Sequence, residues 1–216
     1  MSEATTSEDV RGDGDLRRQI MDAARHLLIE NGYKQLSMRK IADAVGYSAT
    51  SIYLHFDSKD SLFHALIDEG MDMLYGELSR VRERHPDDAL ARLRAHGERY
   101  VRFGLNNPEY YEIMFMLHPE HMERYPARKY RRARRNLDLL AEALEDCARE
   151  GVLELTGDPR VLASTTWAAL HGAISLLIAR RVDVRIDRDT FTQAAVTQAL
   201  RGVNDGSLPG RQPVQT

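Results

Sequence analysis

Apolar side chains recur at helical spacing along nearly the whole chain. A first stripe ends at Asn31-Gly32, a typical helix stop, and its apolar members are Ile20, Ala23, Ala24, Leu27 and Leu28. Similar stripes cover residues 62–81 and 137–152. Nowhere do β-branched residues alternate with polar ones for long, as they would in a strand. The pattern therefore predicts an all-α fold of about nine helices.

Further helix boundaries are visible in the sequence. Asp158-Pro159 has the form of an N-cap followed by the proline of a first helical turn, and a last helix is expected from Asp187 to about Val203. Both ends of the chain are polar and lack periodicity, so residues 1–14 and 204–216 are predicted to be disordered tails.

Composition excludes several classes of protein. With 30 Lys+Arg against 33 Asp+Glu the chain has a net charge of −3, which is unlike a polybasic nucleic-acid coat but allows a local basic patch. The single cysteine, Cys147, forms no intrachain disulfide and supplies no two-Cys or four-Cys zinc site. The polar, acidic start is no signal peptide, and no stretch approaches the ~18 apolar residues of a membrane span, which together predict a cytoplasmic protein.

The most informative segment is residues 36–62, LSMRKIADAVGYSATSIYLHFDSKDSL. Ser37 stands where an N-cap belongs, Gly46 where a tight turn needs positive φ, and Ser48 where it can cap a second short helix. Helix, glycine-containing turn and helix together predict a helix-turn-helix, whose second helix would enter the DNA major groove with Ala49 and Thr50 at its front.

This segment resembles the DNA-binding domain of the TetR family of bacterial transcriptional repressors. The resemblance covers Ile20–Leu62 and comprises three ordered fragments: I-x-x-A-A, then G-Y-x-x-L-S-M-R-x-I-A, then V-G-Y-S-x-x-S-I-Y-x-H-F-x-S-K-x-x-L. It implies a DNA-binding domain over residues 15–60 and a ligand-binding and dimerisation domain over residues 61–203. The regulator would bind a palindromic operator as a homodimer and respond to a ligand.

The resemblance also implies roles for single residues. Ser37 would cap a helix and touch phosphate, Arg39 would reach a base or the backbone, and Ser48 would cap the recognition helix. Ala49 and Thr50 would meet bases. The phosphate contacts would come from Tyr53, His55 and Lys59. Apolar groups suit thymine methyls, and hydroxyl and ammonium groups donate to phosphate oxygens. Residues 15–60 hold seven bases and six acids, a net of +1. Affinity must therefore come from placement and from two subunits.

The segment Thr166–Gly172 is similar to the Trp…His-Gly motif of one C-terminal class of the family. It lies in residues 163–179, which are apolar over most of the circumference of the predicted helix, as expected of a helix that also packs on a partner. The predicted dimer interface comprises Ala168, Ala169, Gly172, Ala173, Phe191 and Ala195.

The sequence also offers candidates for an effector site. Methionine and aromatic side chains are core residues by default, but their density suits a cavity for a small apolar or aromatic ligand. The candidates are Met71, Tyr75, Phe103, Met114, Phe115, Trp167 and His171. For His171 the sequence favours a core or dimer-interface position over a ligand contact, and no cofactor is expected.

Three alternatives remain open at this stage. Residues 128–135, RKYRRARR, are either a second anion-binding patch or a solvated helix face paired with Glu120, Glu123 or Asp138. The segment HPEHMER, residues 118–124, is either a metal site formed by His118, Glu120, His121 and Glu123 or a loop, and Pro119 favours the loop. A helical adaptor without a DNA role is the third alternative. No motif of a nucleophile, a metalloprotease or a phosphate-binding loop is present, so an enzyme is not expected.

Overall fold

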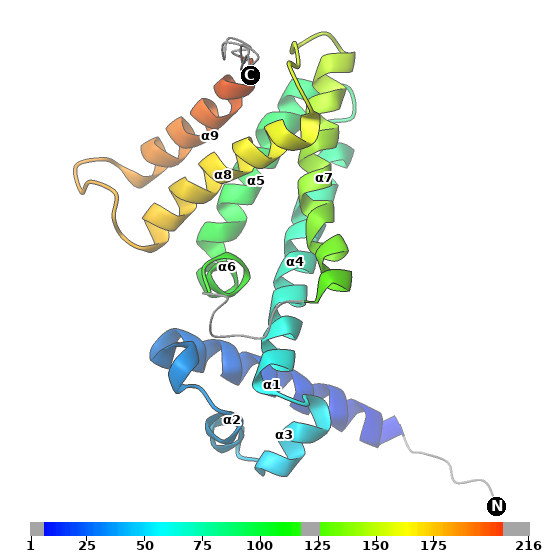
Figure 1. Cartoon of the computed structure of the whole chain (residues 1–216), viewed down its shortest axis with the longest axis vertical. Helices are drawn as coiled ribbons and strands as arrows, with labels where there is room; N and C mark the ends of the chain where they lie inside the picture. Colours follow the sequence, from blue (N-terminus) through cyan, green and yellow to red (C-terminus); the bar gives the residue numbers. More distant parts are fainter. Residues whose placement is uncertain (1–6, 118–125, 205–216) are drawn as a thin grey trace, which may run out of the picture. The chain divides into compact units, whose positions relative to one another are not determined.

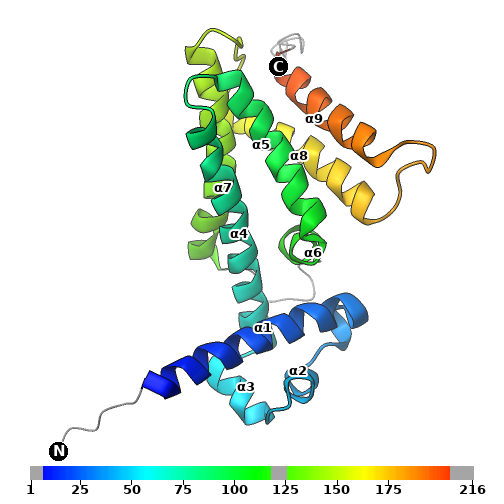
Figure 2. The same ribbon diagram turned by 180° about the vertical axis from the view of Figure 1, so that it is seen from behind.

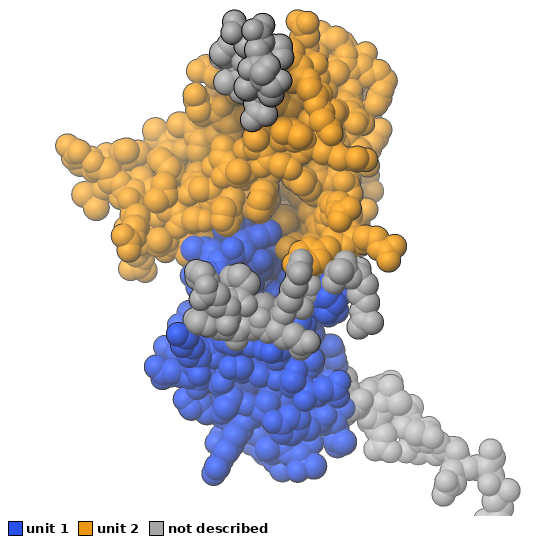
Figure 3. Space-filling model, viewed as in Figure 1, with its two compact units in different colours: residues 1–70, 108–129 blue, residues 71–107, 130–216 orange. Residues whose placement is uncertain are grey.

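The computed structural model describes residues 7–117 and 126–204 (Figure 1). Nine helices and no strand occur in these residues, which confirms the predicted all-α fold. The chain divides into two compact units (Figure 3). The N-terminal unit comprises residues 1–70 and 108–129, and the C-terminal unit comprises residues 71–107 and 130–216. The predicted boundary after residue 60 instead falls inside a helix, and the division lies at Gly70.

Five helices contribute to the N-terminal unit (Figure 2). They are α1 (Ser7–Gln35), α2 (Met38–Val45), α3 (Ala49–His55), the first part of α4 (Lys59–Arg84) and α6 (Pro108–Phe115). Helix α1 begins at Ser7, within the predicted N-terminal tail. Gly32, at φ 72° and ψ 161°, interrupts α1 where the sequence predicted a stop. The core of this unit includes the fully buried side chains of Ile20, Ile41, Ile52 and Phe63.

Helix α6 belongs to the N-terminal unit because it packs on α1 and on the start of α4. Glu109 accepts an ion-paired hydrogen bond from Arg25, and the Tyr110 hydroxyl donates to Glu69 at 2.8 Å. A β-carbon at Gly70 would collide with the thioether of Met114. These contacts join residues far apart in sequence, so no local pattern predicts them.

The C-terminal unit consists of the rest of α4, α5 (Ala89–Asn106), α7 (Ala127–Arg149) from Tyr130, α8 (Pro159–Ile178) and α9 (Arg188–Asn204). Asp158 caps α8 by accepting from the amide of Arg160 at 2.8 Å, as the Asp-Pro pair predicted. Helices α8 and α9 lie side by side, and both contact α5 (Figures 1 and 2). One core cluster of the C-terminal unit consists of the buried residues Ala89, Leu93, Leu140, Ala141, Ala143, Leu144, Cys147, Ala163 and Val203.

A buried ion cluster ties α5 to α7 beside this core. The Arg92 guanidinium donates to Glu150 at 2.7 Å, lies 3.4 Å from Asp146, and donates to the carbonyl oxygens of His85 and Pro86 at 2.8 and 2.7 Å. Arg92 and Asp146 are 5% and 4% exposed. Cys147, the neighbouring residue, is buried without a disulfide, and burial raises the pKa of its thiol to about 11.

Helix α8 corrects one expectation from the sequence. Its 20 residues are long and apolar enough to cross a membrane by length and composition alone, although only 28% of its most apolar window is buried. Residues 161–179 hold no charged side chain, so their mean hydropathy is high. The Ser, Thr and Gly residues among them interrupt any long run of large apolar side chains, which is why the sequence pattern did not indicate a span. One such helix is weak evidence for a membrane span.

Candidate nucleic-acid interface

Helices α2 and α3 are held at their ends by the residues that the sequence identified. The Ser37 hydroxyl accepts from the amide of Lys40 at 3.3 Å, and the Ser48 hydroxyl accepts from the amide of Ser51 at 3.1 Å. Gly46 ends α2 in the left-handed region at φ 75°, where a side chain would be strained. These three local devices fix the turn, so the predicted helix-turn-helix is present.

Helix α3 buries one side and exposes the other. Ile52 and the following Phe56 are buried in the unit's core, whereas Thr50 is exposed and Tyr53 is 51% exposed. Leu54 is 83% exposed, a large value for a leucine on a structured helix. It lies four residues after Thr50 and therefore on the same face. The sequence reasoning missed Leu54, which this i, i+4 relation to Thr50 could have revealed.

The other predicted contact residues are more varied in exposure. Ser37, Arg39 and Ser48 are exposed, and Ala49 and His55 are half-buried. Ser37 and Ser48 use their hydroxyls as caps, so their contribution to DNA contact remains a prediction. Tyr47, which the sequence reasoning also left out, is 47% exposed and directly precedes the Ser48 cap.

Lys59 has partners within its own unit. Its ammonium donates to the carbonyl oxygens of Tyr33 at 3.1 Å and Leu36 at 3.2 Å, and it lies 3.9 Å from the centre of the Tyr33 ring. The Tyr33 hydroxyl in turn donates to Asp60. Burial lowers the pKa of the Lys59 ammonium. The side chain thus fastens the start of α4 to the end of α1, and its implied phosphate contact remains untested.

We therefore expect Lys59→Met to destabilise the protein. Two buried carbonyl oxygens would lose a charged donor, a loss of about 1–3 kcal/mol in the free energy of unfolding. Urea unfolding followed by circular dichroism measures this change. Lys34→Met is the matched control, because Lys34 is exposed. If Lys59→Met left the unfolding curve unchanged but flattened the salt dependence of DNA binding, Lys59 would be a phosphate contact instead.

The residues proposed for an effector do not share one unit. Met114 and Phe115 belong to the N-terminal unit, and the other five belong to the C-terminal unit. Among those five, Trp167 stacks on His171 with ring centres 5.4 Å apart, and its indole N–H donates to the Tyr100 hydroxyl at 2.8 Å. Met71 and Phe103 are buried, while the ring of Tyr75 faces the Arg135 guanidinium at 3.9 Å. The effector site remains a prediction.

Three of the six predicted dimer residues are exposed on α8. Ala168, Ala169 and Gly172 are exposed, whereas Ala173 is buried within its own unit, and Phe191 and Ala195 of α9 are half-buried. The exposed face extends further than predicted. Its members, spaced three or four residues apart along the helix, are Val161, Thr165, Ala168, Gly172 and Leu176.

The basic segment at the start of α7 is largely paired. Lys129 donates to Asp68 at 2.6 Å, and both Arg132 and Arg135 bind Asp72. This supports the solvated, ion-paired helix face, and the acids that pair with it among the described residues belong to α4. Residues 118–123 lie outside the described residues. Within the described part of the chain, no group of three His, Cys, Asp or Glu side chains is arranged to hold a metal ion.

Comparison with known proteins settles the family. Residues 20–66 match the model of bacterial regulatory proteins of the tetR family, and residues 93–199 match a tetracyclin repressor-like C-terminal domain. The chain belongs to the TetR family. This membership confirms the resemblance carried by Ile20–Leu62 and extends it to the C-terminal unit. TetR-family regulators bind DNA and dimerise, and the place of the dimer interface on this chain stays a prediction.

The curated TetR-family relatives match only part of the chain. The chain is 41% identical over 64 residues to the HTH-type transcriptional repressor Rv1474c of Mycobacterium tuberculosis, covering 30% of this chain and 34% of that one. It is 33% identical over 75 residues to the HTH-type transcriptional repressor KstR2 of Rhodococcus jostii, covering 35% and 37%. The matches span about a third of these relatives. A structure of a protein of unknown function from Rhodococcus sp. RHA1 has a TM-score of 0.73 at 26% identity, covering 88% of this chain and 95% of that one.

Proposed function

We propose that this TetR-family protein is a cytoplasmic transcriptional repressor that binds a near-palindromic operator as a homodimer and leaves it when a small apolar or aromatic effector binds. The observation that supports DNA binding most directly is the exposed face of α3 in the helix-turn-helix. This face carries Thr50, Tyr53 and Leu54, while the opposite side of the helix is buried. Two recognition helices related by a twofold axis require half-sites about one helical turn, or a multiple of it, apart.

The exposed face of α3 offers different chemistry at its two ends. The methyl group of Thr50 and the side chain of Leu54 suit thymine methyl groups in the major groove, and they lie on consecutive turns of the helix. The Tyr53 hydroxyl can donate to a phosphate oxygen. Lys59 holds the start of α4 against the end of α1, and its phosphate contact stays a prediction.

Tyr53→Ala should weaken operator binding by roughly 1–3 kcal/mol while leaving the protein folded, because the side chain is half exposed and its loss creates no cavity. The operator is first selected from a random duplex library with the purified protein, and affinity is then measured by fluorescence anisotropy. Tyr130→Ala is the matched control, since Tyr130 is 43% exposed on α7, outside the helix-turn-helix. An asymmetric selected site, or equal effects of the two variants, would contradict the proposal.

Two buried polar atoms in the C-terminal unit support a ligand response. The Nε2 atom of His96 and the Oδ1 atom of Asn136 are buried and have no hydrogen-bond partner among the described residues, and the two residues are only 6% and 9% exposed. An unpaired buried polar atom costs about 1–3 kcal/mol and calls for a partner. A ligand with one hydrogen-bond donor or acceptor and an apolar body could supply the missing partner. Its apolar body would then lie against Met71, Phe103 and Trp167.

His96 should also make stability depend on pH. Burial lowers its pKa below the ordinary value for histidine. The unfolded chain therefore binds the proton more readily, and the free energy of unfolding should fall as the pH drops below about 6.5 towards the pKa of the folded state. Urea unfolding at pH 7.5 and 5.5 should show a smaller decrease for His96→Leu than for the wild type. Equal decreases would mean that His96 titrates alike in both states.

A further inference from the structure

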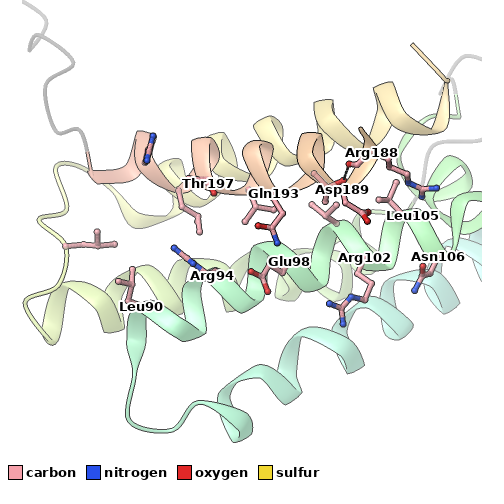
Figure 4. A pocket seen from close by; sticks show the side chains of 16 residues that line it. Leu90, Arg94, Glu98, Arg102, Leu105, Asn106, Arg188, Asp189, Gln193 and Thr197 are labelled. Atoms are coloured by element: carbon pink, nitrogen blue, oxygen red, sulfur yellow. Dashed lines mark hydrogen bonds between the residues drawn. The ribbon is translucent and has the colours of Figure 1, made fainter. Parts of the chain in front are cut away.

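A groove of about 800 Å³ runs between α5 and α9 in the C-terminal unit (Figure 4). Its α5 wall is a regular stripe of side chains four residues apart, namely Leu90, Arg94, Glu98, Arg102 and Asn106. Its α9 wall comprises Arg188, Asp189, Thr192, Gln193, Thr197 and Arg201. None of the predicted effector residues lines it, and neither do Phe191 and Ala195 of the predicted dimer interface.

The groove carries an excess of positive charge. Four arginines and two acids line it, 4 − 2 = +2. The guanidinium groups of Arg94, Arg102, Arg188 and Arg201 make no ion pair or hydrogen bond with the residues that the structure describes, while the Thr192 hydroxyl donates to the carbonyl oxygen of Arg188. The arginines at the start of α7 differ, because Arg132 and Arg135 both bind Asp72. Guanidinium groups without an acidic partner, gathered along one groove, suit carboxylate or phosphate groups of a ligand.

The bottom of the groove is apolar. The groove's accessible apolar side chains are Leu90, which is 47% exposed, and the half-buried Leu105, Leu153 and Leu200, whereas Val101 and Val196 are 1% and 4% exposed. Helices α5 and α9 meet closely there, because a β-carbon at Gly97 would lie 3.2 Å from Val196. A ligand chain lying along this strip would bury apolar surface, while its charged groups met the arginines on the walls.

The charges are grouped at the two ends of the groove. The helices run in opposite directions, so Arg94 lies towards the end of α9 that carries Arg201, and Arg102 lies towards the end that begins with Arg188 (Figure 4). Eight residues at 1.5 Å rise separate Arg94 from Arg102 by about 12 Å along α5. Glu98 lies between them and opposes an anionic group in the middle.

We infer that this groove binds an elongated dianion, with an acidic group at each end and an apolar chain between them. The inference goes beyond the proposed function, since it uses no residue of the DNA-binding face, the predicted effector site or the exposed face of α8. Its failure would leave the proposed repressor function untouched.

Isothermal titration with dodecanedioate tests the inference on the full-length protein. Dodecanoate has the same chain with one carboxylate, and butanedioate has two carboxylates without the long chain. If both arginine clusters and the apolar strip act together, dodecanedioate binds roughly tenfold or more tightly than either control. Equal binding of dodecanoate would show only adsorption of an apolar chain and would overturn the inference.

Variants then locate the site. Arg94→Gln combined with Arg188→Gln removes one arginine from each end and should weaken dodecanedioate binding roughly tenfold or more. Arg131→Gln combined with Arg134→Gln is the matched control, because both residues are exposed arginines on α7 outside the groove. Equal affinity of the two double variants, or no measurable binding of dodecanedioate by the wild type, would exclude the groove as the site.

Discussion

Gly172→Arg is expected to turn the dimer into folded monomers and to reduce operator affinity by about a hundredfold or more, because two half-sites would no longer be bound by one linked molecule. Gly172 lies in the middle of the exposed face of α8, and nothing within 4 Å would meet a β-carbon there. A single protomer therefore accommodates the new side chain. A second α8 packed on the same face could not, since a buried and unpaired guanidinium is costly.

Light scattering and circular dichroism together measure this outcome. The variant should scatter as a monomer at micromolar concentration and keep its helical spectrum. Gly76→Arg is the matched control, since Gly76 also lies within a helix with nothing within 4 Å of an added β-carbon, but on α4. A dimeric Gly172→Arg variant would place the interface elsewhere on the protein.

The helix-turn-helix was predictable because local interactions build it. The hydroxyls of Ser37 and Ser48 each accept a hydrogen bond from the amide three residues later, in the first turn of the helix that they cap. Gly46 supplies the positive φ that ends α2. Each device acts over a few residues and so leaves a readable signature in the sequence. The same holds for Asp158-Pro159 at the start of α8.

The features that the sequence did not predict depend on contacts between residues far apart in the chain. Lys59 follows the motif of a phosphate-binding residue, yet its ammonium lies against carbonyl oxygens 23 and 26 residues away. Helix α6 joins the N-terminal unit through contacts such as Arg25 with Glu109, 84 residues apart. Residues 7–14 have too few apolar side chains to predict a helix, but they continue the helix that Ile20 and Ala24 anchor in the core.

Arg92→Ala should cost about 3–5 kcal/mol in the free energy of unfolding, the usual effect of removing one partner from a buried ion pair. Arg92 contacts Glu150, Asp146 and two loop carbonyl oxygens from a position that is 5% exposed. Arg94→Ala, two residues later and exposed, should change the same quantity by less than about 0.5 kcal/mol. Chemical unfolding of both variants measures the difference, and equal costs would mean that the cluster adds nothing specific.

The origin of this cost can be separated with a double variant. If most of it comes from leaving the Asp146 carboxylate buried beside an apolar gap, Arg92→Met with Asp146→Leu should be clearly more stable than Arg92→Ala. The other partners of Asp146 would lose little, because Arg82 and Arg149 have side chains 64% and 69% exposed and can return to water. The carbonyl oxygens of His85 and Pro86 would still lack their donor, so recovery should be incomplete. A double variant as unstable as Arg92→Ala would show instead that Arg92 acts mainly by fastening the loop between α4 and α5.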